Sequence, residues 1–249
     1  MLARILEPET LDHLAPDDPA AVRSRHDLRR VNRFMGARAI LGRAIDRALP
    51  MARIGAAGKG AAGPLRIVEL GCGDGLLMLD VARSRGRPAA LRNVELTLLD
   101  LQPIVAPTTL AAYAAAGWRA ETLTADVLAW AADTASPTRW DIVVANLFLH
   151  HFEGEALGRL LAGCARRAEA LAATEPRRSR FALAASHLVV CLGANAVTRR
   201  DAVLSVRAGF VGSELSGAWP ASANGWRLEE YEDGPFTHCF CAARQGGAR

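Results

Sequence analysis

A glycine-rich loop between a short apolar segment and a helical one constrains the fold of this chain more than any other feature. The segment from Ile67 to Gly75 is IVELGCGDG, with glycine at 71, 73 and 75, and the helical run LLMLDVAR follows it. Glycines let the backbone turn tightly and leave no side chain where a ligand must lie close. The loop therefore predicts a strand, turn and helix with a nucleotide-like ligand at the carboxyl end of the strand.

The chain after Leu65 alternates between β-type and helical patterns, which predicts successive βα units and a parallel sheet. We expect strands at 66–70, 95–100, 121–124, 141–146 and 180–185, and helices at 76–84, 103–116 and 154–171. Residues 198–210 look helical. The segments 226–234 and 236–245 then predict two strands joined by a Gly234–Pro235 turn, an antiparallel hairpin that closes the sheet.

The N-terminal segment has a different pattern. Pro16 to Pro19 form a helix-start signal, and apolar residues then recur near helical spacing, so two or three helices are expected between residues 11 and 49. The run GAAGKGAAGP at 55–64 predicts a flexible connection. It is not a phosphate-binding P-loop, because Lys59 is followed by Gly60 and no strand precedes it. We therefore expect a helical cap at 1–54, a linker at 55–64 and an α/β domain at 65–249.

Composition excludes several classes of protein. The chain has 249 residues, 51% of them hydrophobic, and this is enough apolar side chain to form one hydrophobic core. The net charge is +4, but Lys59 is the only lysine and the arginines are scattered, which does not predict a nucleic-acid partner. The five cysteines form no C-x-x-C pair, so neither a disulfide framework nor a zinc site is indicated. No signal peptide or membrane span is recognisable, which favours a cytoplasmic location.

The charge around the glycine loop indicates the kind of ligand. Glu69 and Asp74 flank the loop, and carboxylates there would repel a pyrophosphate. A ligand that carries an amino group and a sulfonium is the better electrostatic match. A dehydrogenase of the G-x-G-x-x-G type is disfavoured, since the sixth position from Gly71 is Leu76 where glycine is required.

These residues resemble the first motif of class I S-adenosylmethionine-dependent methyltransferases, which is acidic-x-G-x-G-x-G and spans Glu69–Gly75 here. Three further motifs follow in order: LTLLD ending at Asp100, LTADVLAW containing Asp126, and WDIVVANLFLHHF containing Asn146. The resemblance covers residues 65–152 motif by motif. It implies a Rossmann-like, seven-stranded, mostly parallel sheet with an antiparallel C-terminal hairpin and, here, an N-terminal helical cap.

The resemblance also implies which residues hold the cofactor, S-adenosylmethionine. Asp100 would accept both ribose hydroxyls, Leu101 would line the adenine, Asp126 would accept from the adenine amino group, and the Val127 backbone would contact the ring. The remaining positions that match the family's cofactor site are Glu69, Gly71, Cys72, Gly73 and Asn146. Methyl transfer needs no metal, and none is expected.

Two histidines after the fourth motif are the candidate catalytic residues. His150 or His151 would lie near the acceptor and withdraw a proton from a phenol or hydroxyl group during methyl transfer. The alternative is that one packs against the following helix while the other faces solvent. His187, His238, Cys239 and Cys241 are interpreted as structural residues, and a methyltransferase acting on DNA or RNA bases is disfavoured because Asn146 is followed by Leu147 and Phe148 instead of two prolines.

Apolar residues around the site indicate the acceptor. Phe34 and Met35 end an N-terminal helix and are expected to cover the substrate, with Phe148 at the mouth of the site. We expect O-methylation of a small, lipophilic or phenolic metabolite, of the kind found in secondary metabolism. N- or C-methylation of a small molecule, or a non-catalytic cofactor-binding module, are the alternatives, and the N-terminal helices are the candidate surface for a homodimer.

Overall fold

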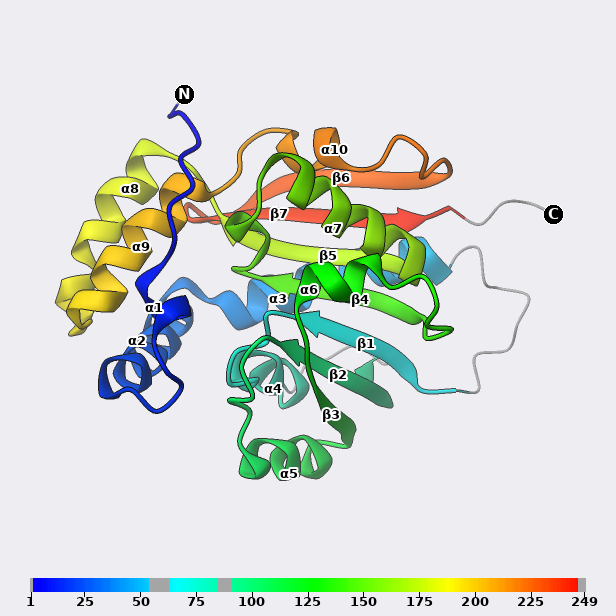
Figure 1. Cartoon of the computed structure of the whole chain (residues 1–249), viewed down its shortest axis with the longest axis horizontal. Helices are drawn as coiled ribbons and strands as arrows, with labels where there is room; N and C mark the ends of the chain where they lie inside the picture. The colour runs from blue at the N-terminus through cyan, green and yellow to red at the C-terminus, as the bar shows by residue number, and fades with distance from the viewer. Residues whose placement is uncertain (1, 54–62, 85–90, 246–249) are drawn as a thin grey trace.

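The chain folds around one twisted seven-stranded sheet with the strand order β3-β2-β1-β4-β5-β7-β6. The computed structural model describes residues 2–53, 63–84 and 91–245 (Figure 1). The strands are β1 Leu65–Leu70, β2 Val94–Asp100, β3 Trp118–Thr124, β4 Trp140–Asn146, β5 Ala168–Pro176, β6 Trp226–Asp233 and β7 Thr237–Arg244. The expected Rossmann-like fold class, including the C-terminal hairpin, is confirmed.

The pairing of the strands decides where a ligand can bind. The pairs β3–β2, β2–β1, β1–β4 and β4–β5 are parallel, whereas β7 is antiparallel to both β5 and β6. The strand order reverses between β1 and β4. In open α/β sheets a crevice forms at this reversal, outside the carboxyl ends of the strands.

Helices cover both faces of the sheet. The α-helices are α1 Thr10–His13, α2 Pro19–Met35, α3 Ala37–Arg53, α4 Leu76–Ala82, α5 Pro107–Ala115, α6 Val127–Ala132, α7 Gly154–Arg167, α8 Arg180–Ser186, α9 Ala196–Ala208 and α10 Glu214–Ala218, and the short 3-10 helices are η2 Leu149–His151 and η3 His187–Leu192. One apolar cluster joins the sheet to α3, α4 and α5, and a second joins it to α6, α7 and α10.

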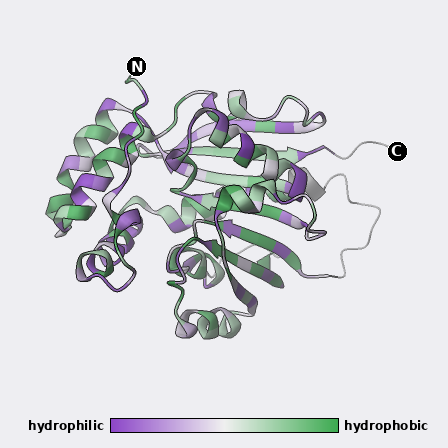
Figure 2. Cartoon of the chain, viewed as in Figure 1, coloured by the Kyte–Doolittle hydropathy of each residue, from purple (hydrophilic) through white to green (hydrophobic). Residues whose placement is uncertain are grey.

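Strand β4 shows why this sheet is the core. Its residues Ile142, Val143, Val144 and Ala145 are all fully buried, and they divide alternately between the two apolar clusters. A central parallel strand is covered on both faces, so it needs apolar side chains at consecutive positions. Figure 2 shows the strands as predominantly hydrophobic, while hydrophilic and hydrophobic residues alternate along the helices at the N-terminal side.

Four helices form a cap over the carboxyl edge of the parallel strands. Helices α1 and α2 from the N-terminus lie beside α8 and α9, which come from the connection between β5 and β6 (Figure 1). The buried carboxylate of Asp27 in α2 accepts from the backbone N–H of Asn195 at 2.7 Å, and the Asn195 side chain caps α9 through Thr198 N. The two halves of the cap are therefore joined by buried polar contacts.

The fifth parallel strand lies elsewhere than expected. Residues 180–185 form most of helix α8, which begins at the Ser179 cap, and β5 is the alanine-rich segment Ala168–Pro176. The expected helix at 154–171 accordingly ends at Arg167. Alanine has little β-propensity, but small side chains suit a strand enclosed between β4 and β7. His187, expected at the end of a buried strand, lies exposed in η3.

The connection between α3 and β1 lies mostly outside the described residues, which include only 63 and 64 of the expected linker at 55–64. Helix α3 itself packs on the sheet, with Leu41, Ala44 and Ile45 fully buried in the core. Of the N-terminal helices, α1 and α2 thus cover the carboxyl edge of the parallel strands, whereas α3 packs on a face of the sheet. Among the described helices none is long and apolar enough to cross a membrane.

Candidate active site

The glycine loop between β1 and α4 takes the conformation that its sequence predicts. Gly71, Gly73 and Gly75 have φ angles of 64°, 55° and 71°, a region that residues with a Cβ rarely adopt. A Cβ on Gly71 would also overlap the ring of Phe148, which follows β4. Glycine at 71 is therefore required both by the backbone and by the close approach of that ring.

Asp100 ties the end of β2 to this loop. Its Oδ2 accepts from Gly73 N at 2.8 Å and its Oδ1 accepts from Gln102 N at 2.9 Å. A cavity opens beside it, whose lining residues include Cys72, Gln102 and Thr124. Leu101, expected to line the adenine, is 68% exposed and so is free to meet a ligand.

Glu69 is the most unusual group in the loop region. Its side chain is buried, and its Oε2 has no hydrogen-bond partner among the described residues. Burial, and then the charges of Asp74 and Asp100, raise the pKa of Glu69 to about 8. A buried carboxylate without a partner is costly unless a cation satisfies it, so this position fits a ligand that carries an ammonium group.

Asp126 and Val127 begin helix α6. The exposed side chain of Asp126 caps the helix by accepting from Ala129 N at 2.8 Å, and Val127 is buried under it. The cap bond uses one oxygen of the carboxylate. Both residues lie beyond the carboxyl end of β3, next in the sheet to β2 with its Asp100.

Asn146 ends β4, and its Oδ1 accepts from Thr174 Oγ1 at 2.8 Å. It lines a second cavity together with Met35 from the end of α2 and Thr237 from the start of β7. Of the two residues expected to cover the acceptor, Met35 lines this cavity, whereas the side chain of Phe34 is 70% exposed. Leu147, which follows Asn146, has a φ of 50° and so turns the chain sharply out of the strand.

A buried carboxylate holds this turn. Glu175 of β5 is fully buried and accepts from three consecutive backbone N–H groups, those of Phe148, Leu149 and His150. Its Oε2 also lies 2.8 Å from Nδ1 of His150. Sequence reasoning missed Glu175 because it placed the fifth strand downstream. The residue determines the direction in which η2 presents its histidines.

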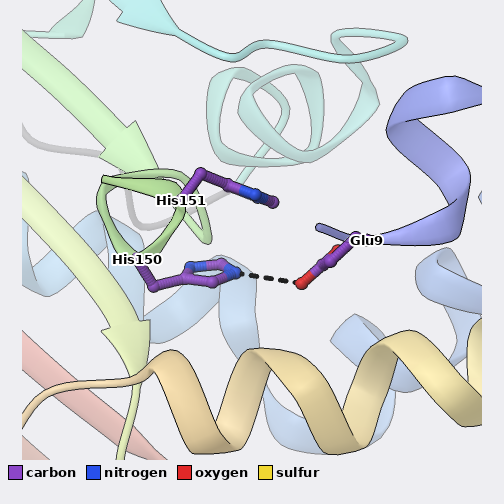
Figure 3. Close-up of side chains that lie close together, drawn as sticks. All are labelled: Glu9, His150 and His151. Atoms are coloured by element: carbon purple, nitrogen blue, oxygen red, sulfur yellow. Dashed lines mark hydrogen bonds and ion pairs between the residues drawn. The ribbon is translucent and has the colours of Figure 1, made fainter. Parts of the chain in front are cut away.

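His150 is enclosed between two carboxylates. Its side chain is 2% exposed, and its Nε2 lies 3.3 Å from Oε1 of Glu9, a residue of the N-terminal segment (Figure 3). Burial alone would lower the pKa of His150, but hydrogen bonds with Glu175 and Glu9 outweigh burial and raise it to about 9. With both ring nitrogens engaged, His150 has no free site from which to take a proton from an acceptor.

His151 lies next to it on the more open side. Its Nδ1 is 3.3 Å from Oδ2 of Asp12 in α1, and its ring lies 4.3 Å, centroid to centroid, from that of His150. Burial, and then the charge of His150, lower the pKa of His151. The ring of His151 also lies 6.2 Å, centroid to centroid, from that of Phe148. The two histidines and this aromatic side chain therefore lie at the same end of the sheet.

The N-terminal segment that supplies Glu9 and Asp12 is fastened at several points. Arg4 donates to the carbonyl oxygens of Ala208, His150 and Phe152, and Asp201 of α9 accepts from the backbone N–H groups of Thr10 and Leu11. Glu9 also accepts from Ser205 Oγ. No local pattern in residues 2–13 indicated that this segment reaches the site.

The residues interpreted as structural at the C-terminus are buried in the sheet. His238 Nε2 lies 2.6 Å from Oε2 of Glu230, and Cys239 and Cys241 are fully buried in β7. Burial raises the pKa of both thiols to about 12. These thiols are therefore protonated at neutral pH and act as small apolar side chains.

A protein-family profile described as "Methyltransferase domain" matches residues 67–170, the span from β1 to β5 that carries the glycine loop, Asp100, Asp126 and the histidine pair. This match and the fold together support a class I S-adenosylmethionine-dependent methyltransferase. S-adenosylmethionine is the methyl donor of that class, and the buried, unpartnered Glu69 fits its amino group.

Solved structures similar to this chain agree with it in fold at low sequence identity. An O-methyltransferase family protein from Burkholderia thailandensis has a TM-score of 0.57 at 16% identity, over 93% of this chain and 62% of the other, so the chain spans under two thirds of that protein. The plantazolicin methyltransferase BpumL in complex with SAH has a TM-score of 0.59 at 12% identity, over 92% of both chains. No curated protein matches the sequence.

Proposed function

We propose that the methyltransferase transfers the methyl group of S-adenosylmethionine to an oxygen atom of a small, lipophilic or phenolic metabolite. The observation that carries this proposal is the imidazole pair His150–His151, which lies beside Phe148 at the carboxyl edge of the sheet, next to the glycine loop. Polar groups next to an aromatic side chain suit an acceptor with one hydroxyl group on an apolar body.

In this proposal the cofactor occupies the crevice between β1, β2 and β4. Its amino group meets Glu69, its ribose hydroxyls meet Asp100, and its adenine lies between Leu101 and the start of α6. The other residues that we propose to contact it are Gly71, Cys72, Gly73, Asp126, Val127 and Asn146. The unpartnered Oε2 of Glu69 and the cavity beside Asp100 support this arrangement.

The reaction is an in-line displacement at the methyl carbon. The acceptor oxygen forms a bond to carbon, the carbon–sulfur bond breaks, S-adenosylhomocysteine leaves as a neutral thioether, and the hydroxyl proton passes to the medium. Alignment of the three atoms provides much of the catalysis. The second requirement is loss of the acceptor's proton, and in this proposal His151, which lies beside the fully engaged His150, contacts the hydroxyl group and assists that loss.

The acceptor pocket is bounded by the cap. Met35 lines the cavity that also contains Asn146, and α1 brings its residues to the histidines. Phe34 is exposed next to this region and is available to an apolar acceptor. The acceptor would then lie between α2, the histidine pair and Phe148, with its hydroxyl group toward the methyl carbon.

The test has two stages. Isothermal titration with S-adenosylmethionine should show micromolar binding that Asp100→Ala abolishes. A panel of phenols, alcohols, amines and thiols is then assayed with native protein and with His151→Ala. Transfer to phenols or alcohols that His151→Ala slows by two to four orders of magnitude, about what acid–base assistance contributes, supports the proposal. Transfer confined to amines, or unaffected by the substitution, contradicts it.

A further inference from the structure

Four side chains with metal-binding atoms meet at the mouth of the site, and two of them, Glu9 and Asp12, have no part in the methyl transfer proposed above. Glu9 comes from the N-terminal segment, and His150 and His151 come from η2 (Figure 3). Asp12, also from the N-terminal segment, lies beside His151. One ligand atom from each of Glu9, His150 and His151 lies within 4.8 Å of the other two. The groups thus come from two parts of the chain that are far apart in sequence.

Two of the separations match those between atoms that share one ion. Glu9 Oε1 is 3.3 Å from His150 Nε2, and Asp12 Oδ2 is 3.3 Å from His151 Nδ1. Nitrogen and oxygen ligands bind a divalent transition metal at about 2.0–2.2 Å, which places neighbouring ligand atoms roughly 3.0–3.5 Å apart. A cation can therefore enter between these groups with small side-chain adjustments.

His150 is held in the orientation of a ligand. Nδ1 of His150 faces Oε2 of Glu175 at 2.8 Å, so its Nε2 faces the cluster. A carboxylate on the far ring nitrogen is the usual partner of a metal-binding histidine, because it fixes the tautomer and the ring plane. Glu175 is in turn fixed by backbone N–H groups from Phe148 and Leu149.

The carboxylates are held in place by the anchoring of their segment. Arg4 binds three backbone carbonyl groups on one side of Glu9, and Asp201 caps the start of α1 on the other. A segment fastened at both ends presents Glu9 at a constant distance from His150. Such preorganisation is what a metal site requires and what a free terminus would not supply.

The charges around the cluster favour a cation. Three carboxylates, Glu9, Asp12 and Glu175, face the two imidazoles, and Asp201 lies close behind Asp12. The guanidinium of Arg4 is nearby, but its donors are directed to backbone carbonyl groups. A divalent ion would offset the excess of negative charge and accept electron pairs from both rings.

We propose that Glu9, His150 and His151, with Asp12 beside them, bind one divalent transition-metal ion such as Zn²⁺ or Mn²⁺. Two imidazoles select first-row transition metals over Mg²⁺ and Ca²⁺, which prefer oxygen ligands alone. The site stands on its own geometry, and its part in catalysis rests on the proposed function. An ion here would bind the acceptor oxygen and lower the pKa of its hydroxyl group, which is the assistance ascribed above to His151.

The experiment measures metal binding directly. Protein stripped with EDTA is titrated with ZnCl₂, MnCl₂ and MgCl₂ by calorimetry, and with CoCl₂ while visible absorbance is recorded. We expect one equivalent of Zn²⁺ or Mn²⁺, weak or no binding of Mg²⁺, and a Co²⁺ spectrum typical of imidazole ligands. Glu9→Gln and His151→Ala should each weaken binding at least tenfold, and Glu175→Gln should weaken it ten- to a hundredfold through His150.

His187→Ala is the matched control, because His187 is an exposed histidine of η3 and does not belong to the cluster. Circular dichroism and titration with S-adenosylmethionine establish that each variant is folded. Absence of binding to native protein, or equal binding by native protein, Glu9→Gln and His151→Ala, overturns the metal proposal. If stripped protein methylates a phenol at the full rate in EDTA, the metal's catalytic role is overturned while O-methylation stands.

Discussion

Glu175 Oε2 lies 2.8 Å from Nδ1 of His150, and the same carboxylate accepts from the three backbone N–H groups that begin the turn after β4. One buried charge therefore decides both the path of the chain and the orientation of a histidine. The strand that carries Glu175 is next to β4 in the sheet. The shape of the site thus depends on a neighbouring strand as much as on the motif itself.

The first prediction concerns this carboxylate. Glu175→Gln should lower the free energy of unfolding by about 3 kcal/mol, because breaking a buried ion pair leaves its partner uncompensated. Urea denaturation measures the change. Glu155→Gln, on an exposed side chain of α7, is the control and should be within ~0.5 kcal/mol of the native protein. A loss of stability below 1 kcal/mol for Glu175→Gln would contradict the assigned role.

The second prediction concerns the glycine loop. Gly71→Ala should destabilise the protein by about 2 kcal/mol or more and abolish binding of S-adenosylmethionine, since its φ is positive and its Cβ would overlap Phe148. Gly42→Ala in α3 is the matched control, because nothing lies within 4 Å of its Cβ. In a helix interior that change should be neutral or stabilising by up to ~1 kcal/mol. Thermal melts measure the stability of both variants, and calorimetry measures their binding of S-adenosylmethionine. Equal melting temperatures for Gly71→Ala and Gly42→Ala would contradict the prediction.

The third prediction is the pH dependence of cofactor binding. The pKa of Glu69 is raised to about 8 in the free protein by burial and by Asp74 and Asp100, while a bound ammonium favours the ionised carboxylate. Affinity for S-adenosylmethionine should therefore rise with pH, by at most about tenfold per unit, and level off above pH 8. Calorimetry in phosphate and in Tris buffers should also show that binding releases a proton.

The control for this pH dependence is Glu69→Gln, which should bind the cofactor more weakly and with an affinity that stays flat from pH 6 to 8. A flat profile in the native protein would show that Glu69 does not pair with the cofactor's amino group. Asp74 also faces this region, and Arg29 of α2 lies 4.0 Å from it. Asp74→Asn should therefore shift the midpoint of the profile to lower pH without removing it.

The fourth prediction concerns stability in acid. Burial alone would raise the pKa of Glu230, but bonds from His238 and from Ser216 outweigh it and hold the pKa below its ordinary value of 4.5. The stabilisation is thus fully present above pH 4.5 and is lost as pH falls through the depressed pKa. Glu230→Gln should destabilise the protein at pH 7, and the difference should shrink below pH 4. A difference that stays constant with pH would show that the pair contributes nothing through ionisation.

Much of the fold, including the glycine loop after β1, was predictable because the signals are local. The apolar strand, the glycines and the acidic residues at strand ends lie within a few positions of one another, and each reflects a requirement of the backbone at that point. The prediction of a strand at 180–185 was wrong, because the apolar pattern of the segment FALAAS fits a buried helix and a buried strand equally well. Only pairing with β4 and β7 identifies the alanine-rich β5 as the strand.

The sequence by itself determined the Rossmann-like sheet, the glycine loop and the carboxylates that lie beside this loop, since these follow from short-range backbone and burial requirements. Only the tertiary structure decided the surroundings of the histidine pair. Glu9 and His150 are 141 positions apart, and Glu175 reaches His150 from a neighbouring strand. Contacts of this kind arise from the packing of the cap on the sheet edge, and no periodicity in either segment encodes them.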